Sequence, residues 1–290
     1  MTMTATPPST PPRSILSPRG GSRGRKIRNM IATGGIAGTF LLACIPLIAV
    51  IAYVIQRGGD VLDWEFLTDP IPIADRIVGP GMGPAVVGTL LITGAAAAMS
   101  IPLGILGGIY LNEYGQRGML ARVIRFLSEV MTGVPSVVMG LFVYTFVVLR
   151  TKELNGFAGA LALMCLMLPI VIRTTDEMLR LVPNELREGS YALGSRQART
   201  IRTVVFPNAA AGIVSGALLA VARAAGETAP LLFTIGIVTE TNTNLFDGQN
   251  TSLSQQIFRN ASSPFVGAQD RAWGAALALI LFVFIFTVAA

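Results

Sequence analysis

The chain has 290 residues and a formal net charge of +6, and 52% of its residues are hydrophobic while only 13% are charged. Soluble domains carry about 25% charged residues, so this composition is typical of a polytopic membrane protein. The absence of histidine excludes imidazole bases, Ser-His-Asp triads and histidine metal sites. The two cysteines, Cys44 and Cys165, lie in apolar runs typical of buried packing residues, and no metal site is expected.

Residues 1–28 are rich in Pro, Ser, Thr, Gly and Arg, which predicts a disordered cytoplasmic tail. Six apolar stretches follow, each long enough to cross a bilayer as a helix, which takes about 20 residues. We place them at 29–56, 84–111, 119–149, 156–181, 208–238 and 272–290. The last stretch ends at Ala290 without a basic segment after it, as in a chain truncated at its C-terminus. The expected fold is therefore all-α, with six transmembrane helices.

Basic residues are concentrated in alternate connecting segments. Fifteen Arg or Lys lie in 1–28, 112–128 and 173–203, whereas six lie in 57–83, 150–155 and 239–271. Cytoplasmic loops carry the excess of Lys and Arg in membrane proteins. We therefore expect a multi-pass protein of the plasma (inner) membrane with a cytoplasmic N-terminus, and the positive charge indicates orientation rather than binding to nucleic acid.

The apolar stretches contain many small residues and several prolines. Gly104 and Gly108 form a Gly-x-x-x-Gly pattern, which allows close helix packing in lipid. Prolines inside four of the stretches predict kinks or interruptions; they are Pro102, Pro135, Pro169 and Pro230.

A polar segment joins the fourth and fifth apolar stretches. Pro183 ends the preceding helix, and Asn184 is suited to cap the start of a new one. Glu185 and Glu188 then fall in the first turns, where negative charge suits the helix dipole, and Gly194 is suited to a turn. We expect a short amphipathic helix at the cytoplasmic surface, which composition alone does not distinguish from an ordinary connector.

This segment is similar to the EAA signature of permease subunits of bacterial ABC importers, in which E-A-A, three residues, G, nine residues, I, one residue and L-P follow each other. The matching positions are Glu188-Gly189-Ser190, Gly194 and Val204-Val205-Phe206-Pro207. The resemblance implies a MetI-like permease core in which residues about 184–200 form the coupling helix that docks on an ATPase subunit. The positions assigned to ATPase coupling are Glu188, Gly189, Ser190, Gly194 and Pro207.

The sequence contains no G-x-x-x-x-G-K-[ST] phosphate loop. The chain itself is therefore not expected to be an enzyme or to hold a cofactor. If the resemblance holds, ATP and Mg²⁺ are bound by the separate ATPase partner.

Arg223 and Glu227 stand within the fifth apolar stretch, where an ion costs about 2.5–3.5 kcal/mol on insertion scales. Arg223 falls near the midpoint of the predicted span, and Glu227, four residues later, falls on the same helical face. The rest of that face is mostly small, which favours a helix that lines a narrow hydrated interior; it comprises Gly212, Ser215, Gly216 and either Ala220 or Leu219. An internal Arg–Glu pair that only fastens helices together is the alternative.

Arg173 lies near the inner end of the fourth stretch, and Glu129 lies in the third. Two arginines at different depths would give an anion successive binding points, because guanidinium offers planar, bidentate hydrogen bonding to phosphate oxygens. Arg173 is equally explained as an interfacial side chain that reaches towards the headgroups. Both interpretations stay open.

Two segments resemble phosphate-specific ABC transporter permeases of the PstA type: "RAAGETAPLLFT" at 223–234 and "TGVPSVVMGLF" at 132–142. "SLSQQIF" and "RAWGAALALI" are also similar to that family's last loop and helix. The similarity covers most of 84–290, the expected permease domain. The first helix and its external loop, at 29–83, are not diagnostic of the family. It implies Arg223, Glu227 and Arg173 as substrate-path residues.

The resemblance also implies the partners: a second, similar permease, two ATPase subunits and an external phosphate-binding protein. The binding protein would dock on 57–83 and 239–271, and phosphate would move inward by alternating access. The same machinery for another oxyanion, such as sulfate or molybdate, is the nearest alternative. An ion-driven secondary transporter and a structural or signalling membrane protein are the alternatives from other classes.

Overall fold

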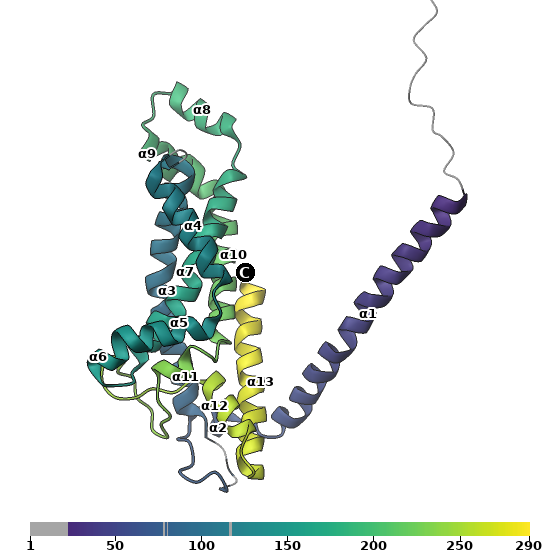
Figure 1. The fold of residues 1–290 in the computed structure, drawn as a ribbon, viewed down its shortest axis with the longest axis vertical. Helices are drawn as coiled ribbons and strands as arrows, with labels where there is room; N and C mark the ends of the chain where they lie inside the picture. The colour runs from purple at the N-terminus through teal and green to yellow at the C-terminus, as the bar shows by residue number, and fades with distance from the viewer. Residues whose placement is uncertain (1–22, 78, 80, 116–117) are drawn as a thin grey trace, which may run out of the picture. The chain divides into compact units, whose positions relative to one another are not determined.

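The computed structural model describes residues 23–77, 79, 81–115 and 118–290, so most of the predicted tail lies outside the described residues. Within these ranges the secondary structure is helical, without a strand (Figure 1). The predicted all-α class is therefore confirmed. The chain divides into two units, 1–52 and 53–290, which are described separately.

The first unit consists of most of α1 (Arg23–Gly59), and most apolar side chains of α1 are exposed. An exposed apolar helix of this length is what contact with lipid requires. α1 begins before residue 29, so residues 23–28 are helical and not part of an irregular tail. In the second unit, the end of α1 contacts α13 (Val266–Ala289), where the Tyr53 and Trp273 rings lie edge to face with centroids 5.0 Å apart.

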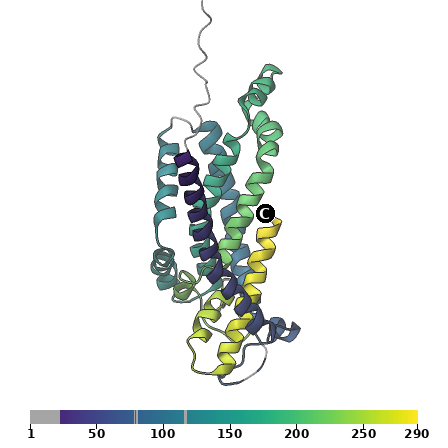
Figure 2. The ribbon, with the colours of Figure 1, turned by 90° about the vertical axis from the view of Figure 1, so that its right-hand side faces the viewer.

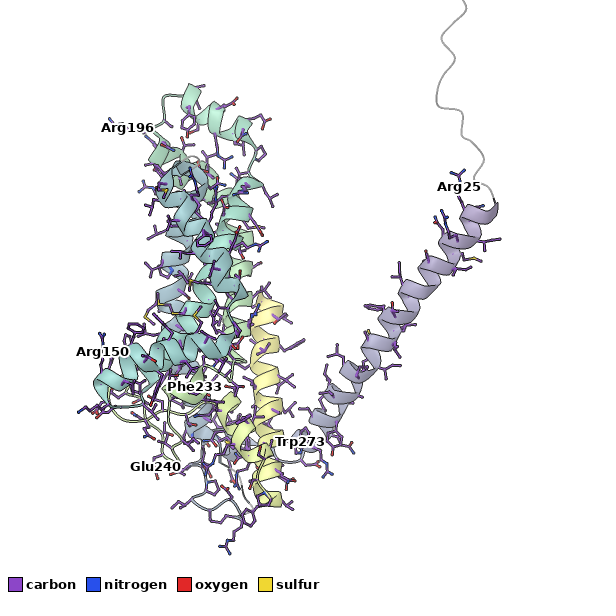
Figure 3. The ribbon with its side chains drawn as sticks, viewed as in Figure 1. Arg25, Arg150, Arg196, Phe233, Glu240 and Trp273 are labelled. Carbon is purple, nitrogen blue, oxygen red and sulfur yellow. The ribbon has the colours of Figure 1, made fainter. Side chains whose placement is uncertain are left out.

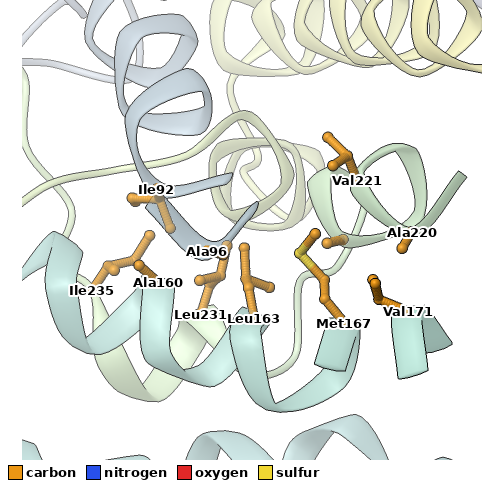
Figure 4. Packing of buried hydrophobic residues seen from close by; sticks show 11 residues of the cluster. Ile92, Ala96, Ala160, Leu163, Met167, Val171, Ala220, Val221, Leu231 and Ile235 are labelled. Atoms are coloured by element: carbon orange, nitrogen blue, oxygen red, sulfur yellow. The ribbon is translucent and has the colours of Figure 1, made fainter. Parts of the chain in front are cut away.

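The second unit is built around α7 (Gly156–Arg180), which packs between α3 (Gly83–Ile109) and α10 (Phe206–Ala225). Their buried apolar side chains form one continuous core, together with α11 (Leu231–Thr234) (Figure 4). α13 packs beside α10 and also contacts α12 (Leu253–Ala261). The expected close packing of the Gly-x-x-x-Gly pattern is confirmed, since a Cβ on Gly104 would lie 2.6 Å from Val171 Cβ.

The third apolar stretch is broken at Pro135, so the interruption predicted at this proline is confirmed, and 119–149 is a bent pair of helices. α4 (Met119–Gly133) and the helical run through α5 (Ser136–Val143), the π-helical turn η2 (Tyr144–Val148) and α6 (Leu149–Thr151) meet at 108°. Pro135 has no amide hydrogen to donate, and it holds Val134 in an extended conformation with ψ 130°. Neither half is long enough to cross about 30 Å of hydrocarbon alone.

The fifth span begins and ends earlier than predicted. α9 (Gln197–Thr200), the π-helical turn η3 (Ile201–Val205) and α10 form one helix over 197–225 instead of 208–238. Arginines on its first turns hide its start from a hydropathy search, and Gly226 ends it. The described residues thus hold five helices long and apolar enough to span a membrane, and the bent pair makes a sixth if counted as one span.

The two ends of the second unit carry different elements. α8 (Asn184–Ala192) and the π-helical turn η1 (Tyr110–Tyr114) lie at one end, and α2 (Trp64–Thr68), α11 and α12 lie towards the other (Figures 1 and 2). Arg196 and Glu240 mark these ends in Figure 3.

A buried arginine fixes the segment between α2 and α3. Arg271 of α13, 1% exposed, donates from Nη1 to Ile77 O at 2.5 Å and from Nη2 to Asp75 O at 3.2 Å. Arg259 of α12 lies 3.8 Å from the Asp75 carboxylate. The segments that precede α3 and α13 are therefore joined to each other.

Gly108→Val should lower the thermal stability of the protein, because a Cβ at this position would lie 2.5 Å from Thr175 Cβ and α3 would have to move away from α7. Overpacking of this kind costs about 1–3 kcal/mol. The measurement is the melting temperature of the purified protein in detergent. Gly94→Val on the same helix is the matched control, since the structure leaves open space around Gly94. Equal effects of the two changes would contradict the packing assignment.

Candidate functional site

Arg223 and Glu227 lie together where α10 ends. Arg223 is in the last turn of α10, and Glu227 follows the C-capping Gly226, with Arg223 Nε 3.9 Å from Glu227 Oε1. The predicted proximity is therefore correct, but the prediction that both lie on one helical face is wrong because the helix stops between them. The Arg223 side chain is 72% exposed and that of Glu227 22%. A long, exposed pair contributes little to stability, about 0–1 kcal/mol.

The two side chains line a pocket of about 250 Å³, which we call the Arg223 pocket. Its opposite wall is the break between α4 and α5, including Thr132, Pro135 and Ser136. The break in the third span thus shapes the pocket. The hydroxyls of Thr132 and Ser136 at this break offer polar contacts to a small ion.

The depth of Arg223 differs from the sequence prediction in one respect. Arg223 lies at the end of its helix and not at the midpoint, because α10 stops at Ala225. The neighbouring α7 supplies Leu166 and Ile170 to the same pocket. These residues lie ten and fourteen positions after Gly156, or about 15 and 21 Å along α7 at 1.5 Å per residue. The pocket is therefore near the middle of the bundle although Arg223 ends its helix.

The small residues before Arg223 serve packing rather than a hydrated interior, which corrects the sequence interpretation. A Cβ on Gly212 would lie 2.3 Å from Met178 Sδ, and one on Gly216 would lie 2.1 Å from Thr174 Cγ2. Ala220 is 1% exposed. α10 is therefore in close contact with α7 up to the last turn, and open space begins only at Arg223.

Pro230 does not break the fifth helix, which has already ended at Ala225. It precedes α11 and contacts Gly140 of α5, where a Cβ would lie 2.6 Å from Pro230 Cα. α5 therefore packs directly on the segment that carries Glu227.

Arg173 lines a second pocket of about 240 Å³, the Arg173 pocket, which also contains Glu129. Arg173 Nε donates to Glu177 Oε1 at 2.8 Å, and both side chains are more than half exposed. Thr132 lines both this pocket and the Arg223 pocket. The two predicted arginines therefore occupy adjoining pockets at different depths along α7.

The predicted coupling segment, residues about 184–200, forms two helices, α8 (Asn184–Ala192) and α9, joined by a turn. α8 begins at Asn184, so Asn184 is the first helical residue and Pro183, not Asn184, occupies the capping position. Gly194 has φ +80°, a left-handed conformation that glycine adopts without strain. Ser195 N donates back to Ser190 O at 3.1 Å and closes the turn before α9.

The five predicted coupling residues differ in exposure. Glu188, Gly189 and Gly194 are exposed on α8 and its turn, and Pro207 is exposed in the first turn of α10. Ser190 is buried, and its hydroxyl lies 2.8 Å from the Thr200 hydroxyl of α9. Ser190 therefore ties the two short helices together, while the other four positions face outwards.

Sequence reasoning missed the ion pair that attaches α8 to the bundle. Arg187 Nη2 lies 2.9 Å from Glu113 Oε1 of η1, and the two side chains are 13% and 5% exposed. Arg187 also donates to Val182 O at 2.6 Å and to Leu179 O at 2.9 Å, both at the end of α7. Gln197 Nε2 donates to Glu113 O at 2.8 Å. The only sequence signal was an arginine on the inner face of an amphipathic helix.

Comparison with known proteins places the chain among membrane transport components. The family model described as "Binding-protein-dependent transport system inner membrane component" matches residues 100–290. The phosphate transport system permease protein PstA of Mycobacterium leprae is 41% identical over 263 residues, covering 89% of this chain and 86% of the relative. PstA of Yersinia pestis is 40% identical over 266 residues, covering 92% and 90%.

The fold is similar to that of solved importers. A chain of the MetNI methionine ABC transporter in an inward-facing conformation aligns with a TM-score of 0.59 and 18% identity, covering 71% of this chain and 90% of that one. At this identity the likeness concerns the fold alone, and it bears out the expected MetI-like permease core.

Gly194→Val should uncouple ATP hydrolysis from transport, because a β-branched residue is strained at φ +80° and would redirect α8. We expect the assembled complex to keep its ATPase activity while its uptake falls by at least about tenfold. Both activities can be measured in proteoliposomes. Gly194→Asn is the matched control, since Asn tolerates the left-handed region. Normal coupling in Gly194→Val would contradict the docking-helix assignment.

Glu113→Gln should loosen α8, because it leaves the buried Arg187 guanidinium without its counter-charge. Breaking a buried pair by changing one partner costs about 3–5 kcal/mol. Protease accessibility of 183–196 in the purified permease measures the effect. Glu188→Gln, on an exposed position of the same helix, should leave cleavage unchanged. Unaltered cleavage in Glu113→Gln would show that the pair does not hold α8.

Proposed function

The chain belongs to the family of binding-protein-dependent transport system inner membrane components, within its PstA-type phosphate permeases, and on this basis we propose that it passes inorganic phosphate from an external binding protein into the cytoplasm. It is a multi-pass inner-membrane permease subunit of an ABC transport system and not an enzyme. The observation that carries the substrate path is the open pocket with a loosely paired guanidinium near the middle of the bundle.

The chemistry of Arg223 suits a passing oxyanion. Its guanidinium keeps its charge at physiological pH and can donate two parallel hydrogen bonds to phosphate oxygens. The contact with Glu227 is long, so most of its donors are available. Glu227 lowers the net charge of the pocket, which limits how tightly an anion is held.

ATP hydrolysis is needed because phosphate is a multivalent anion. Moving a negative charge inward against a potential that is negative inside costs about 2.3 kcal/mol per charge per 100 mV. ATP and Mg²⁺ would be bound by two separate ATPase subunits, and a second, similar permease would complete the passage. The coupling segment around α8, with Glu188, Gly189, Gly194 and Pro207 exposed, would receive the ATPase motion.

The path runs from the Arg223 pocket to the Arg173 pocket and then towards the end that carries α8. We assign this end and the N-terminus to the cytoplasm, because the connecting segments at this end hold most of the basic residues. We take Arg173 as the second binding point rather than a headgroup contact, and its position in a pocket that adjoins the Arg223 pocket supports this choice.

The opposite end would receive the binding protein. Ile71 N donates to Thr239 O at 3.0 Å, which links the two external segments. Ser254 Oγ of α12 donates to Glu227 O at 2.9 Å, so the same external region is bonded to the Arg223 pocket. Docking can therefore shift the pocket if it favours one permease conformation over the other.

Other oxyanions are the nearest alternative, and the named relatives do not favour them. Phosphate uptake measured with an excess of sulfate or molybdate distinguishes these ions. An ion-driven secondary transporter does not fit the family.

Arg223→Ala should abolish phosphate uptake, because the pocket loses its cationic donor, while the complex still assembles. Arg223→Lys should retain part of the activity, since Lys keeps the charge without the bidentate geometry. Radiolabelled phosphate uptake in cells and co-purification of the subunits are the two measurements.

Arg150→Ala is the matched control, because Arg150 is an exposed arginine outside the Arg223 and Arg173 pockets. Loss of assembly in Arg223→Ala would indicate a fastening role, and normal uptake would remove Arg223 from the path.

A further inference from the structure

A third and larger pocket lies beneath α8. It has a volume of about 570 Å³ and is lined mainly by polar side chains of α4, α7, α8, α9 and η1, among them Asn112, Glu113 and Gln197. We call it the Arg187 pocket after the residue that joins α8 to the bundle. Neither the family assignment nor the coupling role of α8 accounts for a polar space of this size.

The Arg187 pocket continues the row formed by the other two. Leu111, Arg125 and Arg180 line both the Arg187 pocket and the Arg173 pocket. Thr132 joins the Arg173 pocket to the Arg223 pocket. Adjacent pockets thus share wall residues from the middle of the bundle to the end that carries α8.

The balance of charge changes along this row. The Arg223 pocket is lined by one arginine and one glutamate, and the Arg173 pocket by three arginines and three carboxylates. The Arg187 pocket is lined by three arginines and a single carboxylate. An anion that moves along the row therefore meets the most positive lining last.

Arg125 supplies the charge that has no partner. Its Nη2 donates to Leu111 O at 3.1 Å, its Nε is buried without a hydrogen-bond partner, and it forms no ion pair with the described residues. Arg187, in contrast, is neutralised by Glu113. Arg180 is paired with Asp176 at 2.6 Å but is still 55% exposed. Arg125 and Arg180 are therefore the side chains with donors to offer.

We propose that the Arg187 pocket is an inorganic oxyanion site, the last station for phosphate before the cytoplasm, and that Arg125 is its principal binding residue. This inference rests on the proposed function, since it assigns the inner end of the same path. Phosphate leaves the Arg173 pocket past Arg125, which borders both spaces, and is released beneath α8. Movement of α8 during ATP hydrolysis then changes the pocket that phosphate leaves.

The test measures whether inorganic phosphate shields this pocket. The complete complex is assembled in nanodiscs of phosphatidylcholine with Cys44→Ala, Cys165→Ala and Asn112→Cys in this chain, and maleimide labelling of position 112 is followed without ATP or binding protein. Asn112 lines the pocket and makes only long hydrogen bonds, at 3.4 Å. We expect phosphate to slow labelling several-fold compared with chloride at equal ionic strength.

Arg125→Gln should remove this protection, and Arg122→Gln should preserve it. Arg122 is the matched control because it is an exposed arginine one turn earlier on α4 and lines none of the three pockets. Protection that survives Arg125→Gln, or labelling that phosphate does not slow, overturns the proposal. So does a cysteine that never labels, because the pocket would then be closed in the complex.

A second set of nanodiscs, containing phosphatidylglycerol, distinguishes a lipid headgroup from free phosphate. Slower labelling in these discs, with no effect of inorganic phosphate in neutral discs, would assign the site to a headgroup and overturn the transport role. Phosphate uptake by the same complex, measured in proteoliposomes, tests the proposed function separately from the exit site. Uptake without protection removes the exit site alone, whereas protection without uptake removes the proposed function and leaves an anion site.

Discussion

The close contact of α7 with α3 and α10 is the constraint on which the second unit depends. Glycines at positions 104, 108, 212 and 216 bring the helix backbones so near that a single methyl group would collide with the neighbour. In lipid, where apolar side chains gain little from leaving their surroundings, such contact is the main source of helix association. The helices therefore stay in contact along this seam, and two of the three pockets described above lie where a helix ends or breaks.

The pockets follow from this constraint. The Arg223 pocket lies where α10 ends and the third span bends, and the Arg187 pocket lies where α7 gives way to α8. Charged side chains at these places avoid the hydrocarbon and also avoid the packed seam. The route proposed for the anion is thus the set of positions that packing leaves open.

Much of this architecture could be predicted from residues alone, and the failures have physical causes. Long apolar runs predict the number of spans because the bilayer sets their length, and a four-residue spacing was enough to place Glu227 beside Arg223. An interruption was predicted at Pro135, but the same reasoning applied to Pro102 and Pro169, which remain inside continuous helices. A proline removes one hydrogen bond from a helix, and the sequence does not show where packing keeps the helix continuous.

The residues of the site could be predicted from the sequence, but the contacts between distant residues could not. Periodicity along one chain segment cannot reveal that Arg187 meets Glu113, which is 74 residues away. Gly212 and Gly216 were misread because a small residue fits both a hydrated wall and a close contact, and only the presence of α7 decides between them. The family signature located α8 correctly because its glycine must adopt a left-handed conformation at φ +80°.

The end of α10 has an effect on how long an ion stays beside Arg223. The carboxyl end of a helix carries about half an elementary negative charge, and α10 ends beside the Arg223 pocket, where the carbonyls of Arg223 and Ala224 accept hydrogen bonds from the amides of Gly226 and Glu227. A guanidinium placed against such a field attracts an anion while the backbone behind it repels the same ion. On the proposed path this balance would favour brief occupancy, so the helix terminus would promote throughput rather than retention.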